Sequence, residues 1–323
     1  MARPLRIEYE GAFYHVTARG NERRRIYYSK ADYEKFKAYL EETQKKYGYL
    51  LHGYVLLTNH YHLLIETPMA NLSKVMHYIN GSYTNYINIK ERRSGHLFQG
   101  RYKAILIDRD EYLLELSRYL HLNPVRAKIA ERPEDYPYSS YRAYIEKNKK
   151  DIVYRDLILG MMSKTKNNAI NKYKNFVGGA IEVDLENPLK NVYGGMILGG
   201  TRFIKEALSI FKEEDLNKED IAHRRALRAA YRFEEIIESI CMSLDIPQQD
   251  LLSRKNKEQR NIAIYLLKKY TGLTNRQIGQ QLGNISYSAV AKVYQRFSEE
   301  LRKDKALKKK VEGIISNLSL VKG

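Results

Sequence analysis

Two histidines separated by a single residue, His60 and His62, are the side chains of this sequence best suited to chemistry. The flanking residues 53–57 and 63–65 are mostly β-branched, aromatic or aliphatic, which is typical of an extended strand. On a strand, side chains two residues apart project from the same face, so the two imidazoles should lie side by side. Such a pair can chelate a metal ion, but ordinary half-buried histidines are the alternative when the spacing is taken alone.

A second pair, Tyr119 and Asn123, lies near the end of a helix predicted at residues 110–123. Recurring leucines and an acidic first turn favour the helix, and Pro124 is expected to end it, because proline disfavours helical geometry in the preceding residue. Residues four apart on a helix are separated by about 40° and share one face. A tyrosine hydroxyl attacks a phosphodiester effectively only when the phosphate is neutralised and the leaving oxygen is stabilised. A divalent ion held by the histidine pair and the Asn123 amide oxygen would do both.

Five motifs, in order along the chain, resemble those of the HUH single-strand DNA transposases with one catalytic tyrosine, in particular the REP-associated tyrosine transposases. They are Arg19-Gly20-Asn21 with Arg23, His60-Tyr61-His62, residues 95–103, residues 118–125 and residues 135–141. The resemblance covers residues 1–145 and implies a ferredoxin-like arrangement. Tyr136 stands where the family often carries tryptophan, and we interpret this as a tolerated aromatic exchange.

The resemblance also implies roles for individual residues. It assigns metal binding to the positions of His60 and His62, and nucleophilic attack to the position of Tyr119. The third ligand of the family is a polar residue one helical turn after the tyrosine, here Asn123. An asparagine before proline can equally cap the helix end or hydrogen-bond the following turn. The expected cofactor is Mg²⁺ or Mn²⁺, and a nitrogen-rich site would also take zinc or nickel.

The composition points to a polyanionic partner. The chain of 323 residues has a net charge of +18 and a pI near 9.6, while 43% hydrophobic residues are enough to build packed cores. The single cysteine, Cys241, excludes an internal disulfide. The N-terminus lacks an apolar signal core and no stretch of 18 apolar residues occurs, so we expect a soluble, cytoplasmic protein without membrane contact.

Basic and aromatic residues are interleaved in the N-terminal half. Guanidinium groups bind phosphate and exposed rings stack on unpaired bases, so this mixture favours single-stranded DNA. The rings expected to stack are Tyr27, Tyr28, Phe98 and Tyr102. A solvated turn is the alternative for residues 23–25. The DNA contacts predicted in this half are Arg19, Asn21, Arg23, Arg24, Arg101 and Lys103.

The order of predicted elements indicates an α+β fold. Strands are expected at residues 12–18, 48–57, 60–66 and 102–107, and helices at 29–47, 72–91 and 110–123. This order suits an antiparallel sheet with helices on one face. We predict three parts: a nuclease domain at residues 1–145, a mainly helical connection at 146–235, and an all-α domain at 236–323.

The C-terminal part has the layout of a helix-turn-helix. Helices are expected at residues 257–270, 274–282 and 286–300, with a glycine turn at 283–285. Residues 263–267, 271–273, 278–279 and 283–290 resemble the duplex-binding domain of the bacterial replication initiator DnaA. The five residues expected to contact DNA at this helix are Asn284, Ser286, Tyr287 and Ser288, at or near the groove floor, and Lys292, at a phosphate. Arg254, Lys255, Lys257 and Arg296 are also placed for phosphates.

These observations favour a metal-dependent transposase that cuts single-stranded DNA through a covalent 5′-phosphotyrosine intermediate. Its partners would be single-stranded hairpin DNA and flanking duplex DNA, and the protein would be a monomer or a homodimer. The alternative is a non-catalytic DNA-binding regulator on the same scaffold.

Overall fold

The computed structural model describes residues 3–4, 7–148, 151–183, 187–210, 221–222, 231, 233–252 and 256–320. The chain divides into two compact units. The N-terminal unit is Arg6–Ala207, and the C-terminal unit is Leu208–Gly323 together with Met1–Leu5. Of the helices in these described residues, none is long and apolar enough to cross a membrane.

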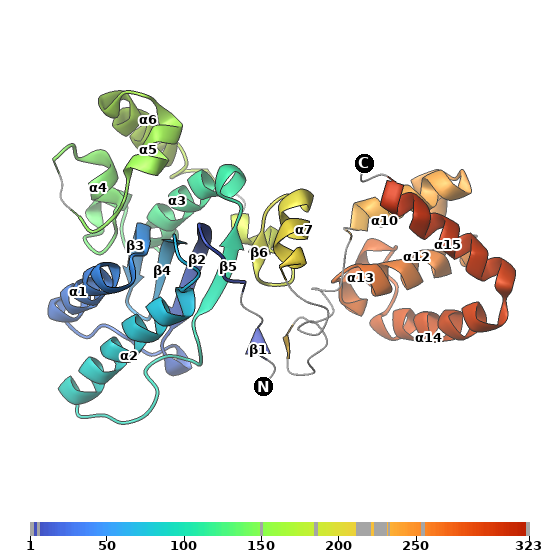
Figure 1. Ribbon diagram of the computed structural model, residues 1–323, viewed down its shortest axis with the longest axis horizontal. Coiled ribbons are helices and arrows are strands. Elements are labelled where there is room, and N and C mark those ends of the chain that lie inside the picture. The colour runs from blue at the N-terminus through green and yellow to red at the C-terminus, as the bar shows by residue number, and fades with distance from the viewer. Residues whose placement is uncertain are drawn as a thin grey trace. The chain divides into compact units, whose positions relative to one another are not determined.

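A five-stranded sheet forms the centre of the N-terminal unit (Figure 1). In spatial order its strands are β3 (Leu50–Leu57), β4 (His60–Thr67), β2 (Ala12–Arg19), β5 (Lys103–Ile107) and β6 (Ile197–Leu198). The first four are antiparallel as expected, which confirms the α+β class. The expectation of a purely antiparallel sheet is wrong at one edge, because β6 runs parallel to β5. Residues 196–198, far along the chain from β5, cover the edge of that strand, and the Leu106 N–H of β5 donates to the Met196 carbonyl at 2.7 Å.

Helices cover both faces of this sheet, not one as the sequence suggested (Figure 1). On one face Tyr61 of β4 packs against Phe36 of α1 (Lys30–Tyr47), with ring centroids 5.0 Å apart, and its hydroxyl donates to Asn80 of α2 (Leu72–Lys90). On the other face Gly53 of β3 lies beneath Leu120 of α3 (Arg109–Arg126). Strand β4 is buried on both sides, and its alternating side chains therefore divide between two cores. His60 and His62 belong to the α3 face.

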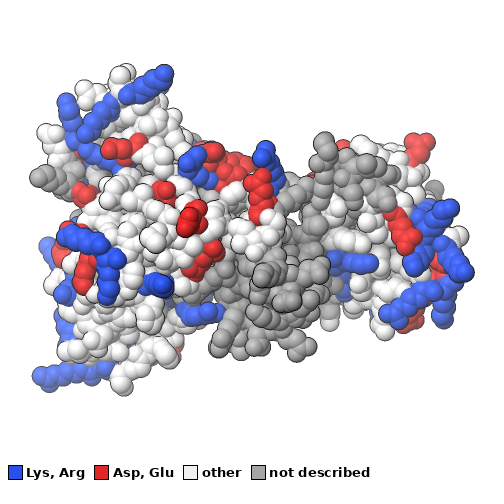
Figure 2. All heavy atoms as spheres, in the orientation of Figure 1, with Lys and Arg blue, Asp and Glu red and all other residues white. Residues whose placement is uncertain are grey.

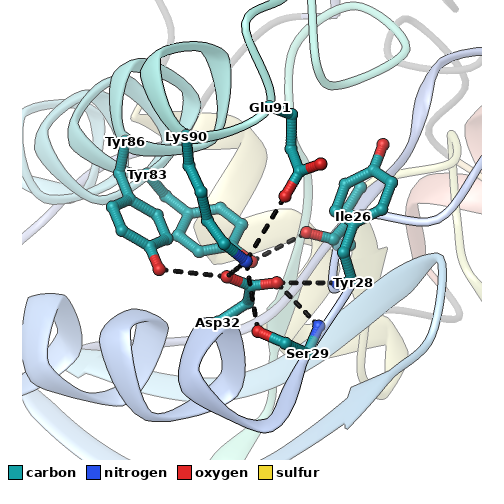
Figure 3. A network of polar contacts seen from close by, with 8 residues as sticks. All are labelled: Ile26, Tyr28, Ser29, Asp32, Tyr83, Tyr86, Lys90 and Glu91. Carbon is teal, nitrogen blue, oxygen red and sulfur yellow. Dashed lines mark hydrogen bonds and ion pairs between the residues drawn. The ribbon is translucent and has the colours of Figure 1, made fainter.

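A polar network fixes helix α1 to helix α2 (Figure 3). Asp32, three residues after the N-cap Ser29, accepts the backbone N–H groups of Tyr28 and Ser29, each at 2.8 Å. Its other oxygen accepts from Lys90 at 2.7 Å and from Tyr86 at 3.0 Å, both near the end of α2. Asp32 is fully buried, and these partners replace the water that its charge has lost. The C-terminal half of α2 is thus held in a defined position.

Helix α3 continues through Pro124, so the predicted end at residue 123 is wrong. Pro124 is buried and lacks an N–H group, but the backbone of the next turn still bonds backwards, as in the 2.9 Å bond from Ala127 to the Asn123 carbonyl. The helix therefore gains Arg126 as its last residue. The geometric penalty of proline is local, and burial against the core keeps the final turn in place.

Three helices that follow α3 in the chain pack around it. They are α4 (Tyr141–Ile145), α5 (Asp156–Met162) and α6 (Lys166–Gly178). His121 of α3 is fully buried and bonds the Tyr173 hydroxyl of α6 at 2.7 Å through Nδ1, and the Ser140 hydroxyl at 2.9 Å through Nε2. Arg118 lies over the Phe176 ring, 4.1 Å from its centroid. These contacts give the first part of the middle region a structural role, because they hold the helix that carries Tyr119.

The C-terminal unit is mainly helical. Its described helices are α10 (Phe233–Leu244), α11 (Gln248–Leu252), α12 (Lys257–Tyr270), α13 (Asn275–Gln281), α14 (Tyr287–Lys303) and α15 (Lys305–Leu320). Two short strands, β1 (Arg3–Pro4) and β7 (Ile221–Ala222), pair in parallel. The turn between α13 and α14 requires glycine at position 279, because a Cβ there would lie 2.0 Å from the Ile285 carbonyl oxygen. This close approach fixes the angle between the two helices.

Among the described residues on the face shown in Figure 2, positive charge is spread over both units. Lysine and arginine side chains are scattered over the face in Figure 2, with acidic side chains between them. Within the C-terminal unit, basic side chains gather where α14 meets α15. The exposed members there are Arg302, Lys303, Lys305, Lys308, Lys309 and Lys310.

Candidate active site

The register of the sheet places the two histidines beside residues of β2 and near a lysine of β5, at one end of the sheet. His60 of β4 pairs with Arg19 of β2, and His62 pairs with Thr17, whose partner on the next strand is Lys103. The two imidazole centroids are 5.1 Å apart and nearly perpendicular. The pair therefore shares one face, as the spacing predicted.

The hydrogen bonds of His60 leave one of its nitrogens available. Nδ1 lies 2.7 Å from Oδ1 of Asn59, an acceptor, so this nitrogen carries the proton. The orientation of the Asn59 amide is set independently, because its Nδ2 donates to the Arg23 carbonyl at 3.0 Å. Nε2 of His60 then carries a lone pair. That is the state in which an imidazole binds a metal ion.

His62 is held by a histidine that the sequence analysis did not single out. Its Nδ1 lies 2.9 Å from Nε2 of His15, and the two rings stack with centroids 5.1 Å apart. Both residues are buried, with 8% and 2% of their surfaces exposed. If His62 donates through Nδ1, its Nε2 is free as a ligand and His15 acts as the acceptor that orients the ring. His15 lies two residues before Thr17 on β2, so the two side chains share a face of the strand that pairs with β4. The alternation along residues 12–18 was the sequence signal by which His15 could have been found.

Burial keeps these histidines neutral. It lowers the pKa of His60 to about 4, with the Arg19 charge adding to the effect, and lowers the pKa of His15 to about 4. The pKa of His62 lies well below its usual value, mainly through burial and further through its histidine neighbours. Neutral imidazole is the metal-binding form, so no proton has to be displaced near neutral pH.

Tyr119 reaches the same face from helix α3. Its ring lies edge-on to His62 with centroids 6.3 Å apart. Burial raises the pKa of the Tyr119 phenol, but Arg126 and a hydrogen bond from the Asn187 side chain oppose that rise. The Arg126 guanidinium lies 5.3 Å from the ring centroid. Both neighbours were missed: Arg126 because the helix was expected to stop at residue 123, and Asn187 because it lies 68 positions further along the chain.

Asn123 remains a candidate third ligand. Its Nδ2 donates to the Tyr119 carbonyl at 3.2 Å, which leaves Oδ1 for a ligand. The alternative that it caps the helix is wrong, because α3 ends at Arg126 and its C-cap is Ala127. Among the described residues there is no group of three or more His, Cys, Asp and Glu side chains that could hold a metal. Imidazole nitrogens and an amide oxygen are donors that divalent ions accept, and oxygens from water or substrate would have to complete the coordination.

The predicted DNA contacts of this unit are exposed around the histidine end of the sheet. Arg19 and Lys103 flank the pair across β2 and β5, and Arg101 precedes β5. Asn21, Arg23 and Arg24 lie in the loop that follows β2. The loop closes tightly over Gly20, where a Cβ would lie 2.1 Å from the Arg24 carbonyl oxygen.

The expected stacking platform is largely absent among the four aromatic residues predicted for it. Tyr27, Tyr102 and Phe98 are at most 7% exposed, and Tyr61 packs against Phe98. Only Tyr28, at 43%, presents substantial surface. These rings lie in segments between the helices and strands and pack inward, as in the stack of Tyr27 on Tyr33 of α1 with centroids 4.2 Å apart. Base stacking here therefore rests on few side chains.

The C-terminal residues predicted to face DNA lie where the recognition helix begins. Thr274 caps α13 in a capping box with Gln277, and the Ser286 hydroxyl caps α14 by accepting the Ala289 N–H at 3.2 Å. Asn284 has φ 59°, in the left-handed region of the turn. All five predicted residues are exposed, Tyr287 to 67%. Lys257 and Arg296 are described, whereas Arg254 and Lys255 lie outside the described residues.

Comparison with known proteins gives two family likenesses, one in each unit of the chain. The family model described as IS200-like transposase matches residues 8–123, the segment that begins before β2 and ends at the candidate third ligand. Residues 8–123 are an IS200-like transposase domain. Membership implies a DNA transposase or nuclease role. The model of the bacterial DnaA helix-turn-helix matches residues 233–296, so α10 to α14 form a DnaA-type DNA-binding domain.

Two individual proteins illustrate the two likenesses. The chromosomal replication initiator protein DnaA of Oleidesulfovibrio alaskensis is 28% identical over 106 residues, 32% of this chain. The chain spans only 23% of that initiator. A solved structure of a REP-associated tyrosine transposase bound to a REP hairpin is 16% identical and has a TM-score of 0.41, over 48% of this chain and 91% of its own.

Proposed function

We propose that this protein is a metal-dependent transposase that cleaves and rejoins single-stranded DNA through Tyr119. The observation that carries the proposal is the convergence of the Tyr119 ring with His60 and His62 on one face of the sheet. Both imidazoles are neutral, and each has its Nδ1 engaged by a neighbour. A packed core would account for buried histidines but not for a phenol flanked by a guanidinium and an amide.

In the proposed step, Tyr119 Oη attacks the phosphorus of a phosphodiester. The new bond joins the tyrosine oxygen to phosphorus, and the bond from phosphorus to the 3′-oxygen breaks. The phenol loses its proton and the departing oxygen gains one, so the products are a 5′-phosphotyrosine and a free 3′-hydroxyl. Strand transfer is the same exchange in reverse with another 3′-hydroxyl. Arg126 and Asn187 would stabilise the phenolate, and Arg19 and Lys103 would bind phosphate.

A divalent ion, Mg²⁺ or Mn²⁺, would be held by His60, His62 and Asn123. It would supply positive charge at the scissile phosphate and orient it. The rest of the rate enhancement depends on the chain itself, because the position of Tyr119 is set by the packing of α3 against α6 and the sheet.

The C-terminal helix-turn-helix would bind duplex DNA next to the single-stranded substrate. Asn284, Ser286, Tyr287 and Ser288 would read bases, and Lys292 would neutralise a phosphate. Attachment to the nuclease through one chain raises the effective concentration of substrate at Tyr119. By function, the proposed parts are a nuclease at residues 1–145, a connection at 146–235 and a duplex-binding domain at 236–323. The protein would act on hairpin DNA as a monomer or a homodimer.

The decisive experiment is a denaturing gel after incubation with labelled single-stranded hairpin DNA and Mn²⁺. Wild-type protein should give a covalent protein–DNA band, and Tyr119→Phe should give none while still binding the hairpin. Tyr112→Phe is the matched control, since it removes a hydroxyl from the same helix two turns earlier, about 10 Å away along the axis. Hairpin binding without any covalent band in the wild type would instead support a non-catalytic DNA-binding regulator.

A further inference from the structure

Helix α6 presents an exposed face made of asparagine and lysine. Four of its thirteen residues are asparagines, against 20 in the chain of 323. No aspartate or glutamate occurs from residue 157 to residue 181, a stretch that contains the whole helix. Basic side chains project from the end of the unit that α5 and α6 form (Figure 2). The helix lies outside the segment that the IS200-like family model matches, so that likeness assigns it no role.

The period of the helix separates this face from the core. The four buried residues of α6 are Ala169, Ile170, Tyr173 and Val177. The four exposed asparagines are Asn167, Asn168, Asn171 and Asn175. At 3.6 residues per turn the asparagines occupy a sector of about 100° that points away from the buried side. Lys172 and Lys174, both exposed, lie at the two edges of that sector. The outer face is therefore a row of amides bordered by positive charge.

Helix formation and internal contacts do not account for the amides. Asparagine is a poorer helix former than alanine, glutamine, glutamate or lysine, because its side chain competes for backbone hydrogen bonds. A face that only meets water is better built from those residues, with charges of both signs. No hydrogen bond joins any of the four asparagine side chains to another residue in the described part of the chain. Each amide thus keeps a donor and an acceptor for a ligand.

Helix α6 is held in place against the helix that carries Tyr119. The Tyr173 hydroxyl lies 2.7 Å from Nδ1 of His121 on α3. The Phe176 ring lies under the guanidinium of Arg118, 4.1 Å from its centroid. Because these contacts fix the inner side of α6, the outer face has a defined orientation before any ligand arrives.

We propose that the exposed face of α6 enters the major groove of duplex DNA and reads adenine. The major groove admits an α-helix, and an asparagine amide matches adenine, donating to N7 and accepting from the N6 amino group. Asn167 and Asn175 are eight residues apart, about 12 Å along the axis, which is the length of about three to four base pairs. Lys172 and Lys174 lie where phosphates border the groove.

This surface is a second duplex-binding site, separate from the start of α14, and the proposal does not rest on cleavage by Tyr119. The absence of carboxylates from residues 157–181 makes the face complementary to a polyanion. Double-stranded RNA is a poor match, because its major groove is too narrow for a helix. An acidic protein segment is the competing occupant.

The test is selection of preferred sequences from a randomised DNA duplex library by the full-length protein, in EDTA so that cleavage does not contribute. The wild type should enrich an A·T-rich element of about three to four base pairs in addition to the element read by α14. Asn171→Ala should lose the A·T-rich element and keep the other, whereas Tyr287→Ala should do the reverse. Asn85→Ala, a matched exchange at an exposed asparagine of α2, should keep both. Alanine favours a helix, so Asn171→Ala should keep or raise the melting temperature.

Fluorescence titrations then measure affinity for a duplex with the A·T-rich element and for one with G·C pairs in its place. Asn171→Ala should reduce the preference between them about tenfold. Lys172→Ala should weaken binding of both duplexes and flatten the salt dependence by about one unit. Lys45→Ala removes an exposed lysine of α1 and should change neither quantity.

An A·T-rich element that survives in Asn171→Ala would overturn the proposal. So would a wild type that enriches only an element lost in Tyr287→Ala, since the outer face of α6 would then meet solvent or an acidic protein. An equal loss of affinity on the A·T-rich and G·C duplexes would also overturn it, because that pattern belongs to phosphate contact without base reading. Loss of the element in Asn171→Ala, in a protein that forms no covalent band with Mn²⁺, would keep this surface and remove the proposed nuclease activity.

Discussion

The two units differ in how they hold the side chains that matter most. In the N-terminal unit His60, His62 and Tyr119 each contact a partner within the protein, and burial shifts the pKa of all three. In the C-terminal unit the residues at the start of α14 are exposed, and their few hydrogen bonds are local ones such as the Ser286 cap. A bond-breaking site requires groups fixed before the substrate arrives, whereas base reading requires donors and acceptors left free for DNA. Substitutions in the first unit should therefore change rates, and those in the second should change affinity.

The largest expected effect is loss of the histidine pair. His60→Ala and His62→Ala should each lower metal-dependent cleavage by more than about 100-fold, because a single imidazole holds a divalent ion weakly. Calorimetric titration with Mn²⁺ should show the lost binding directly, and EDTA should reproduce it in the wild type. His77→Ala removes an exposed imidazole of α2 and should titrate normally. Unchanged Mn²⁺ binding in both site variants would mean that the pair is structural.

The neighbours of Tyr119 should have the next largest effect. Arg126 and Asn187 oppose the rise in the phenol pKa that burial causes, so Arg126→Ala and Asn187→Ala should raise that pKa further. Less phenolate is then present at any pH below the pKa. The cleavage rate should fall roughly tenfold to a hundredfold near neutral pH, and the pH–rate profile should move to higher pH.

Arg109→Ala provides the control for this shift, since it removes an exposed arginine from the first turn of the same helix. It should leave the profile in place. If the Arg126 and Asn187 variants still slow cleavage at a pH above the phenol pKa, where the phenol is ionised in variant and wild type alike, their role is to position the phenol rather than to stabilise its anion.

The sequence singled out the candidate residues of both sites but not the residues that pack behind them. Alternation along 60–67 and the 3.6-residue period along 110–123 follow from local geometry, so the face shared by His60 and His62 was predicted from spacing. The roles proposed for the pair and for Tyr119 came from the resemblance to a family. His15 and Asn187 reach the site through strand pairing and chain return, which depend on contacts between distant segments. The end of α3 was misplaced because the rule for the residue before proline is local, and burial of Pro124 outweighs it.

The parallel strand β6 was missed for a related reason. Residues 197–198 have no strand signal of their own, and their extended form comes from pairing with β5. In the C-terminal unit, by contrast, the helix-turn-helix was predicted almost residue by residue. Its caps, glycine turn and apolar faces are all encoded within short windows, and Thr274 and Ser286 cap the helices as expected.

A pH-dependent loss of stability should belong to the N-terminal unit. Burial lowers the pKa of His121 from 6.5 to about 3, so the folded state binds this proton less readily than the unfolded state. Its contribution is complete above the unfolded pKa of 6.5 and is lost as the pH falls towards 3. Over that window the free energy of unfolding should fall by up to ~1.4 kcal/mol per pH unit for this one proton.

His121→Gln should reduce that slope, because glutamine keeps a donor and an acceptor for Tyr173 and Ser140 but does not titrate. Urea titrations followed by circular dichroism at several pH values measure the slope. The surface exchange His77→Gln should leave it unchanged. A slope identical in His121→Gln and wild type would place the acid sensitivity on other buried histidines, such as His15.

The smallest effects are expected at the exposed start of α14, where they also distinguish two kinds of DNA contact. Lys292→Ala should weaken duplex binding by a similar small factor for every sequence and flatten the salt dependence by about one unit, because one phosphate contact is lost. Tyr287→Ala should cost roughly 1 kcal/mol at a preferred site and almost nothing elsewhere, with the salt slope unchanged. Lys292→Arg keeps the charge and should restore the wild-type slope. Fluorescence titrations of preferred and scrambled duplexes at several salt concentrations measure both quantities.

If both variants change affinity alike on all sequences, α14 contacts the DNA backbone without reading bases. If neither changes it, the exposed face of this helix serves a protein partner, and the contrast between a fixed catalytic unit and a free DNA-reading unit no longer holds.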